Sequence, residues 1–352
     1  MIGIVGGYGQ VGRVAAAYLR AVDAGQLRIG GRRKERAVQL AEDLGDAEGW
    51  AVDVSDLADF CAGCEVILNC AGPSAEVGTA VARAAAAAGA SYVDAAGDEP
   101  LRQALCGLPW PSNHTAVVSA GMMPGLSGLL PQFLAADTGF QGEALTAYIG
   151  GCDTFSEAAA SDYLRASADG FGEPFAAWRN GFRVRRALNA RSGLQVPFFP
   201  NPVHVLPYLS TETEWLAKRL GLTDVDWYSA FDGDLTYAAL SGDAAGLCRA
   251  AEADTFGRVR YQLLVFSLTG PTGARTLICR GTNASSLTGT AAGLAVTAVT
   301  SGKVGAGVWH LAEVLDPAWA VQRLRQSAAV TAFEILAVGV GAGAGAEEEG
   351  EL

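Results

Sequence analysis

The chain has 352 residues, a formal net charge of −12 at pH 7 and a composition that is 50% hydrophobic. A chain of this length can form two domains with substantial cores. The excess of acidic residues and the lack of a clustered basic segment argue against a nucleic-acid partner. No basic region precedes the apolar start at Ile2, and no apolar run of membrane-span length stands out. We therefore expect a cytoplasmic protein with neither a secretion signal nor a membrane partner.

The first element is a short apolar run, Ile2 to Val5, which is followed directly by Gly7, Gly9 and Gly12 in GxGxxG spacing. Apolar residues then recur at helical spacing, so the glycines lie at a turn from a strand to a helix. We expect Gly7 to permit the tight turn, Gly9 to let the backbone approach a pyrophosphate, and Gly12 to let the helix pack closely. The stretch predicts a dinucleotide site rather than a plain tight turn, with cofactor contacts at Gly7, Tyr8, Gly9, Gln10, Val11 and Gly12.

Strands and helices alternate over the next hundred residues. We expect strands at 27–30, 50–54, 66–68, 91–93 and 116–119, and helices at 37–44, 57–61 and 77–88. This alternation predicts an α/β fold with a Rossmann doubly wound parallel sheet. Ligands of such sheets lie at the carboxyl ends of the strands. The loops at those ends add cofactor contacts at Asp53, Val54, Asn69, Ala71, Gly72, Pro73 and Gly121.

The end of the second strand indicates which cofactor is used. An NAD site carries an acidic residue about 20 residues beyond the fingerprint, to bind the ribose 2′-hydroxyl. Here that place reads Gly31-Arg32-Arg33-Lys34. We expect Gly31 to leave room for a 2′-phosphate and Arg32 to bind it with forked hydrogen bonds, with Arg33 or Lys34 secondary. The cofactor is therefore predicted to be NADP(H); the alternative is a solvated basic turn that caps the next helix.

The pattern changes after about Ala136. Apolar runs at 145–149, 182–184, 196–199, 227–231, 259–268 and 275–279 predict an inserted α+β domain on a mostly antiparallel sheet. We expect the chain to return to the first domain at helices after Thr288 and after Pro317. An apolar segment at 328–340 is also expected to be a packed helix. The predicted domains are residues 1–125 plus 285–340 for NADP binding, 126–284 for substrate binding and dimerisation, and a disordered tail at 341–352.

The middle region is rich in aromatic residues, which is typical either of a core with a homodimer face or of a partly apolar substrate pocket. The seven scattered cysteines are expected to be reduced thiols. Cys61 and Cys64 have CxxC spacing, but no second Cys or His pair completes a zinc site, so we interpret them as ordinary buried cysteines. No metal is expected.

Four motifs together resemble the saccharopine dehydrogenase (saccharopine reductase-like) family: the glycine fingerprint, 69–73 (NCAGP), 90–94 (ASYVD) and 121–125 (GMMPG). The resemblance covers residues 1–135 and extends to 302–317. It implies a Rossmann domain completed by C-terminal helices, an inserted sheet domain, and NAD(P)-dependent oxidation or reduction at carbon, often at a C=N bond to an amine.

The chain departs from that family in length and in its substrate motifs. It is shorter than the saccharopine-forming enzymes and lacks a clear match for their binding of a two-amino-acid substrate. We therefore expect an NADPH-dependent reductase of an imine or thiazoline-like group on a small or carrier-bound metabolite, in specialised or amino-acid metabolism. The alternatives are a saccharopine-type dehydrogenase, a trans-acting enoyl reductase, and a non-catalytic NADP-sensing Rossmann protein.

Hydride transfer to an imine needs a proton source near the nicotinamide. Asp94 ends the fifth strand beside the expected nicotinamide, and Asp98 follows in the same loop. His204 lies in a proline-rich segment that we expect to border the pocket. These three are the catalytic candidates, and the alternative for Asp94 is that it caps the next turn.

Overall fold

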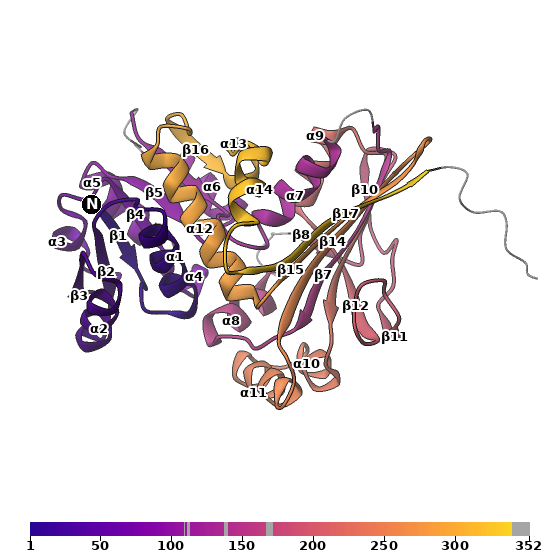
Figure 1. The fold of residues 1–352 in the computed structure, drawn as a ribbon, viewed down its shortest axis with the longest axis horizontal. Coiled ribbons are helices and arrows are strands. Elements are labelled where there is room, and N and C mark those ends of the chain that lie inside the picture. Colours follow the sequence, from indigo (N-terminus) through magenta and orange to yellow (C-terminus); the bar gives the residue numbers. More distant parts are fainter. Residues whose placement is uncertain (109, 111–112, 137–139, 167–171, 340–352) are drawn as a thin grey trace, which may run out of the picture.

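The computed structural model describes residues 1–108, 110, 113–136, 140–166 and 172–339. Two sheets organise these residues, one of seven strands and one of ten. Figure 1 shows the two sheets at opposite ends of the molecule, with helix α12 (Ala284–Thr300) running between them. Among the described residues, every helix is too short or too polar to cross a membrane.

The seven-stranded sheet is parallel throughout and has the order β16-β6-β5-β4-β1-β2-β3. Its strands are β1 (Ile2–Val5), β2 (Leu27–Gly31), β3 (Ala47–Ala51), β4 (Val66–Asn69), β5 (Ser91–Asp94), β6 (Thr115–Val118) and β16 (Gly307–His310). The connecting helices are α1 (Gln10–Ala21), α2 (Lys34–Leu44), α3 (Ala58–Cys61), α4 (Ser74–Val77), α5 (Ala80–Ala87) and α6 (Glu99–Cys106). Crossover helices cover both faces, so most strands read as continuous buried apolar runs.

Two of the expected elements differ in detail. The strand expected at 50–54 ends at Ala51, because Asp53 accepts hydrogen bonds from Ser55 and starts a turn there. The helix expected at 77–88 is divided into α4 and α5 by Gly78, whose φ of +51° does not fit a helix.

The C-terminal part of the chain completes the first sheet. Strand β16 pairs with β6 at its edge, and α12 packs on α1. The two helices approach closely because α12 carries glycines at the contact. A Cβ atom at Gly289 would lie 2.6 Å from the Val11 carbonyl oxygen, and one at Gly293 would lie 2.4 Å from the Tyr18 ring. Helices α13 (Leu311–Val314) and α14 (Pro317–Leu324) follow.

The ten-stranded sheet is mixed and mostly antiparallel, since only β7 and β13 pair in parallel among its described strands. Its strands are β7 (Ala144–Cys152), β8 (Gly172–Pro174), β9 (Ala177–Arg179), β10 (Phe182–Val184), β11 (Arg191–Leu194), β12 (Val203–Ser210), β13 (Asp224–Phe231), β14 (Tyr261–Gly270), β15 (Gly273–Gly281) and β17 (Val330–Gly339). Its helices are α7 (Leu126–Ala135), α8 (Glu157–Arg165), α9 (Thr211–Leu220), α10 (Asp234–Ala239) and α11 (Ala244–Thr255). The predicted fold class, a parallel Rossmann sheet with a second, mostly antiparallel sheet, is confirmed.

Two predictions for the second sheet are wrong. The apolar segment at 328–340 forms strand β17 on β15 instead of a helix, because the free edge of β15 supplies backbone partners along its whole length. Residues 330–339 therefore pair with the second sheet rather than returning to the first. Residues 196–199 form a turn instead of a strand, with Phe198 at φ +74° between buried Val196 and Phe199. The tail at 341–352 lies outside the described residues.

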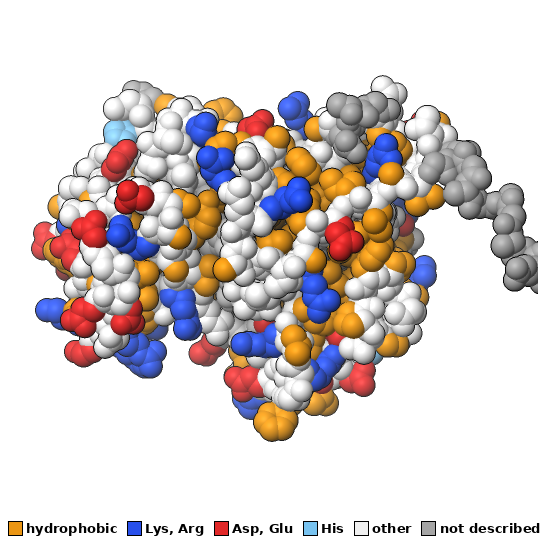
Figure 2. All heavy atoms as spheres, viewed as in Figure 1, with side chains coloured by type: hydrophobic (Ala, Val, Ile, Leu, Met, Phe, Trp, Pro, Cys, Tyr) orange, Lys and Arg blue, Asp and Glu red, His pale blue; other side chains and the backbone are white. Residues whose placement is uncertain are grey.

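The two ends of the molecule differ in surface character. Charged side chains crowd the end formed by α2 and β3, whereas apolar side chains gather over the second sheet (Figure 2). The exposed apolar residues there include Ile335, Leu336 and Val338 on β17. One hydrophobic cluster nevertheless spans both sheets, from Ile4 through Leu294 of α12 to Phe266 of β14. The homodimer stays a prediction.

Candidate functional site

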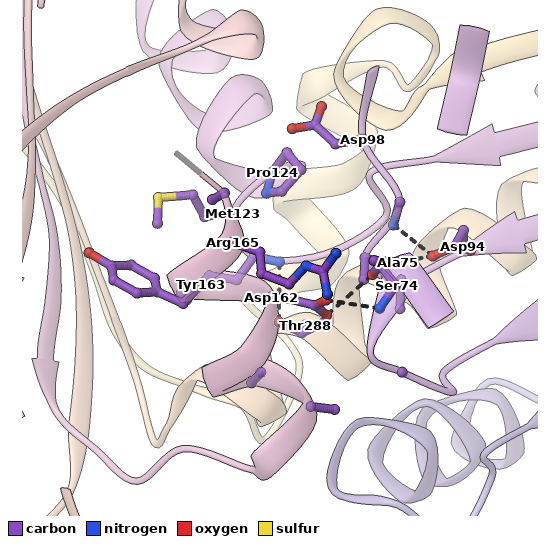
Figure 3. A pocket seen from close by; sticks show the side chains of 18 of the residues that line it. Ser74, Ala75, Asp94, Asp98, Met123, Pro124, Asp162, Tyr163, Arg165 and Thr288 are labelled. Atoms are coloured by element: carbon purple, nitrogen blue, oxygen red, sulfur yellow. Dashed lines mark hydrogen bonds between the residues drawn. The ribbon is translucent and has the colours of Figure 1, made fainter. Parts of the chain in front are cut away.

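A cavity of about 960 Å³ lies between the carboxyl end of the parallel sheet and the second sheet. It begins at Gly9–Val11 in the glycine loop and passes the ends of β4 and β5. It then reaches α8, β12 and the first turn of α9. Figure 3 shows the cavity from close by, with Asp98 above Pro124, Tyr163 below Met123 at the left, and Asp94 at the right. Its size is typical of a site that encloses a small organic ligand.

The glycine loop has the geometry of a phosphate cradle. A Cβ atom at Gly12 would lie 2.3 Å from the Gly6 carbonyl oxygen, so only glycine lets α1 start this close to β1. Gly9 is the N-cap of α1 and forms no side-chain cap, which leaves the first backbone N–H groups of the helix for a ligand. The tight turn, however, belongs to Gly6, at φ +73°, and not to Gly7 as expected. Gly7 instead packs against Ile29, 2.9 Å from where its Cβ would be.

The basic turn after β2 lies at the same edge of the sheet. Arg32 and Arg33 are exposed, and Arg33 is the N-cap of α2. The expectation that Gly31 leaves room for a phosphate is wrong, because the Tyr8 ring fills that space. A Cβ at Gly31 would lie 2.3 Å from Tyr8 Cε1, and the Tyr8 hydroxyl accepts a hydrogen bond of 2.9 Å from the Arg33 N–H.

The Asp53 carboxylate lies near Arg32 in this turn. Hydrogen bonds from the backbone N–H and the hydroxyl of Ser55 lower the pKa of Asp53, and the Arg32 guanidinium lowers it further. Val54 packs against the hydrophobic cluster around Phe60. The edge of the sheet predicted to bind the adenosine end of a cofactor therefore contains Asp53, Val54, Arg32 and Arg33. These residues lie outside the cavity lining.

Asp94 is the centre of the loop structure at the ends of β4 and β5. Its buried carboxylate accepts four hydrogen bonds, from Asn69 Nδ2 (3.0 Å), the Ala96 and Gly97 N–H groups (2.9 and 2.7 Å) and the Tyr92 hydroxyl. Although Asp94 lines the cavity, these donors occupy both carboxylate oxygens. The geometry favours the alternative that Asp94 organises the following turn.

The remaining loop residues flank the cavity. Asn69 also accepts a hydrogen bond of 3.1 Å from the Ala71 N–H, and Ala71 and Gly72 line the cavity. The Gly72–Pro73 bond is cis, and Pro73 is the N-cap of α4. Gly121 is not part of the lining; its backbone lies against the Ala95 carbonyl, where a Cβ would come within 2.4 Å of the oxygen.

Asp98 is a buried carboxyl group that faces the cavity. It is 6% exposed and caps α6, where one oxygen accepts a hydrogen bond of 2.7 Å from the Glu99 N–H. The other oxygen accepts no hydrogen bond from the described residues. Burial raises the pKa of Asp98 to about 6, although the Glu99 N–H and nearby His310 favour the charged form.

A chain of hydrogen bonds supports the Asp98 segment from behind. His310 Nε2 lies 2.8 Å from Glu99 Oε2, and its Nδ1 lies 2.8 Å from Ser119 Oγ. Ser119 in turn donates a hydrogen bond of 2.9 Å to the Gly97 carbonyl. His310 therefore ties the residues on both sides of Asp98 to the edge strand β16.

Glu212 is a site residue that the sequence did not reveal. It stands in the first turn of α9 and reads there as an ordinary acidic residue at a helix start. In the fold its carboxyl lines the cavity and accepts hydrogen bonds from the Gly125 N–H (2.7 Å) and the Ser127 hydroxyl. Removal from bulk water raises the pKa of Glu212 to about 7, and the charge of Asp98 acts in the same direction.

His204 is not brought to this site. Its Nε2 pairs with Asp234 at 2.7 Å, and its ring stacks on Tyr237 with centroids 4.4 Å apart. The proline-rich segment forms part of strand β12, whose Leu206 and Tyr208 line the cavity, while His204 lies farther along the strand. The expected role of His204 at the pocket is therefore a wrong prediction.

Cys61 and Cys64 are buried in the core beside Arg28, whose Nη1 donates to the Phe60 carbonyl at 2.6 Å. Burial raises the pKa of Cys61 to about 11, which keeps the thiol protonated and unreactive. Within the described part of the chain, no group of three or more Cys, His, Asp or Glu side chains is placed to hold a metal ion.

The comparisons with known proteins agree with the motif resemblance. Residues 2–115 match the family model described as saccharopine dehydrogenase NADP binding domain. No curated protein matches the chain in sequence.

Two solved structures share the architecture. One is apo histidine-tagged saccharopine dehydrogenase (L-Glu forming) from Saccharomyces cerevisiae, with 14% identity, a TM-score of 0.68, and coverage of 96% of this chain and 99% of that one. The other is a probable dehydrogenase from Thermotoga maritima, with 11% identity, a TM-score of 0.51, and coverage of 92% and 94%. At these identities the likeness shows a common fold. Residues 2–115 therefore match an NADP-binding domain of the saccharopine dehydrogenase type, and the rest of the chain shares the fold of these dehydrogenases.

Proposed function

We propose that the protein is an NADPH-dependent reductase of a C=N bond, in an imine or thiazoline-like group of a small or carrier-bound metabolite. The observation that carries this proposal is the cavity, which joins the glycine loop to the protonatable carboxyls of Asp98 and Glu212. A hydride donor and a proton donor are the two components that imine reduction requires.

The residues of the first domain fit a dinucleotide phosphate. The uncapped start of α1 and the absence of side chains at Gly9 and Gly12 leave space and N–H donors for a pyrophosphate. Arg32 and Arg33 are exposed beyond β2, where a guanidinium can bind a 2′-phosphate with two hydrogen bonds. These features support NADP(H), which when bound supplies the hydride.

We assign the donation of the proton to Asp98. A carboxyl group whose pKa is about 6 is partly protonated near neutral pH, so it can give its proton to the nitrogen of a neutral imine. The carbon then receives the hydride and the product is an amine. Asp98 is held in position as the N-cap of α6, and Met123, Pro124 and Tyr163 line the same cavity.

The test is NADPH oxidation, followed at 340 nm, with cyclic imines such as 1-piperideine and 3,4-dihydroisoquinoline. We expect turnover by the wild type and a loss of about 10²-fold in Asp98→Asn, since general acid catalysis contributes about that factor. NADPH binding without oxidation in the presence of imines or enoyl thioesters would contradict the proposal and favour a cofactor-sensing protein.

A further inference from the structure

The cavity that holds Asp98 carries more acidic than basic side chains. Four carboxyl-bearing residues line it: Asp94, Asp98, Asp162 and Glu212. Arg165 is the one cationic side chain among the described residues of the lining, and it lies beside Asp162 in Figure 3. An anionic substrate would meet a surplus of like charge here, whereas a cationic group would be stabilised.

Three of the four carboxyls accept hydrogen bonds on both oxygens, and for Glu212 the donors are the Gly125 N–H and the Ser127 hydroxyl. The Asp94 oxygens take up four donors, and those of Asp162 accept from the N–H and hydroxyl of Ser74. Asp98, by contrast, is 6% exposed and presents one oxygen to the cavity without a donor from the described residues. Glu212 lies close enough for the charge on Asp98 to raise its pKa. This oxygen of Asp98 is therefore available to accept a hydrogen bond from a ligand in the cavity.

Besides these charged groups and several Ser, Thr, Asn and Gln side chains, the lining contains large apolar and aromatic residues. They come from both domains, namely Met122, Met123, Phe155, Tyr163, Tyr208 and Trp227. Tyr163 is fixed by edge contacts with Phe155 and Phe231, at centroid distances of 6.0 and 5.9 Å. Such walls favour an apolar or aromatic body, and they attract a cation through the faces of the rings.

We infer that the substrate is a protonatable imine on an apolar body without a carboxylate, and that its nitrogen binds between Asp98 and Glu212 as a cation. This inference rests on the proposed function and gives its substrate class. A neutral imine takes the proton of Asp98 as it binds, which leaves an iminium–carboxylate pair. The iminium carbon then accepts the hydride, and the nitrogen keeps the proton in the amine product.

The first experiment measures ligand class without catalysis. Calorimetry with NADP⁺ present compares 1,2,3,4-tetrahydroisoquinoline, an amine of the product type, with its 3-carboxylate, which differs by one negative group. We expect the wild type to bind the plain amine at least tenfold more tightly. Equal or tighter binding of the carboxylate, or binding of neither compound, would overturn the inference.

A matched pair of variants tests whether the cation binds beside Glu212. Glu212→Gln keeps an acceptor for the Gly125 N–H while removing the charge. The plain amine should therefore bind about tenfold more weakly, and the difference in affinity between the amine and its 3-carboxylate should become smaller. Glu157→Gln removes an exposed carboxyl from α8, outside the cavity, and should leave both affinities unchanged. Unchanged affinity in Glu212→Gln would contradict the assignment.

A third measurement needs no variant. A bound cation favours the ionised carboxyls, so binding of the amine to wild type near pH 6.5 should release protons, seen as a binding enthalpy that depends on the buffer. Binding without proton release would contradict the proposed position of the nitrogen. If the protein binds the plain amine more tightly than the 3-carboxylate but does not reduce imines, the inferred ligand class is supported and the proposed reaction is rejected.

Discussion

Ser74 and Asp162 join the two walls of the cavity. The N–H and the hydroxyl of Ser74, at the start of α4 in the first domain, donate to the two oxygens of Asp162 on α8, at 2.9 and 3.2 Å. Burial raises the pKa of Asp162, and the two hydrogen bonds from Ser74 oppose that effect. The pair therefore fixes α8 beside the loop that follows β4, next to the predicted cofactor site.

Asp162→Ala should loosen this junction. Loss of hydrogen bonds to a partly buried carboxylate should lower the free energy of unfolding by about 1–2 kcal/mol, and the KM for NADPH should rise severalfold because α8 no longer holds the loop. Urea unfolding and steady-state kinetics measure the two effects. Glu157→Ala, at an exposed position of the same helix, is the control. If both variants match the wild type, the pair has no such role.

Asp94→Asn should act mainly on stability. An amide cannot accept hydrogen bonds on its nitrogen, so one side of the cluster formed by Tyr92, Asn69 and the two backbone N–H groups would lose its acceptor. We expect the free energy of unfolding to fall by about 2–3 kcal/mol, measured by urea denaturation. Wild-type stability combined with a loss of turnover of about 10²-fold would instead assign the proton transfer to Asp94.

Asp98→Asn should spare the fold and reduce turnover. Asparagine caps a helix as well as aspartate does, so α6 should remain intact. Because the acid form donates the proton and the pKa of Asp98 is about 6, wild-type kcat should fall as the pH rises above about 6. The variant should lose that dependence along with about 10²-fold in rate. A variant that keeps the wild-type pH profile would exclude Asp98 as the donor.

His310→Gln should move this pH profile. His310 favours the charged form of Asp98, so its removal should raise the pKa of Asp98 and shift the decline of kcat to higher pH. The other ionisable groups around Asp98, which are Glu99, Tyr208 and Glu212, remain in place. His114→Gln, which alters a histidine bonded to the Gly89 carbonyl at the opposite end of β6, should leave the profile unchanged. An unshifted profile in His310→Gln would limit that residue to supporting the loop.

Arg32→Ala should reduce the preference for NADPH over NADH. Loss of a forked, charge-assisted pair of bonds to a 2′-phosphate should lower kcat/KM with NADPH by about tenfold to a hundredfold and change NADH little. Arg36→Ala removes the same charge from an exposed position one turn into α2 and is the matched control. Equal use of both cofactors by the wild type, or an equal loss for both in Arg32→Ala, would reject the NADP(H) assignment.

Features that depend only on residues near each other in the chain can be predicted from the amino-acid sequence. The β1–α1 turn follows from a short apolar run, three spaced glycines and a helical stripe, and the order of strands and helices in the first sheet follows from similar patterns. Asp94 and Asp98 were also found in this way, because the carboxyl ends of parallel strands share one edge. Propensity and periodicity act over a few residues, so such features can be read without the fold.

The contacts that these residues make depend on how the whole chain folds. Tyr8 fills the space beside Gly31, the free edge of β15 makes 330–339 a strand, and donors from two strands occupy Asp94. Glu212 accepts its hydrogen bond from Gly125 across 87 residues of chain, and no local pattern marks it. A hydrogen bond or a change in pKa depends on distance and burial in space, and these are determined only when both domains pack around the same cavity.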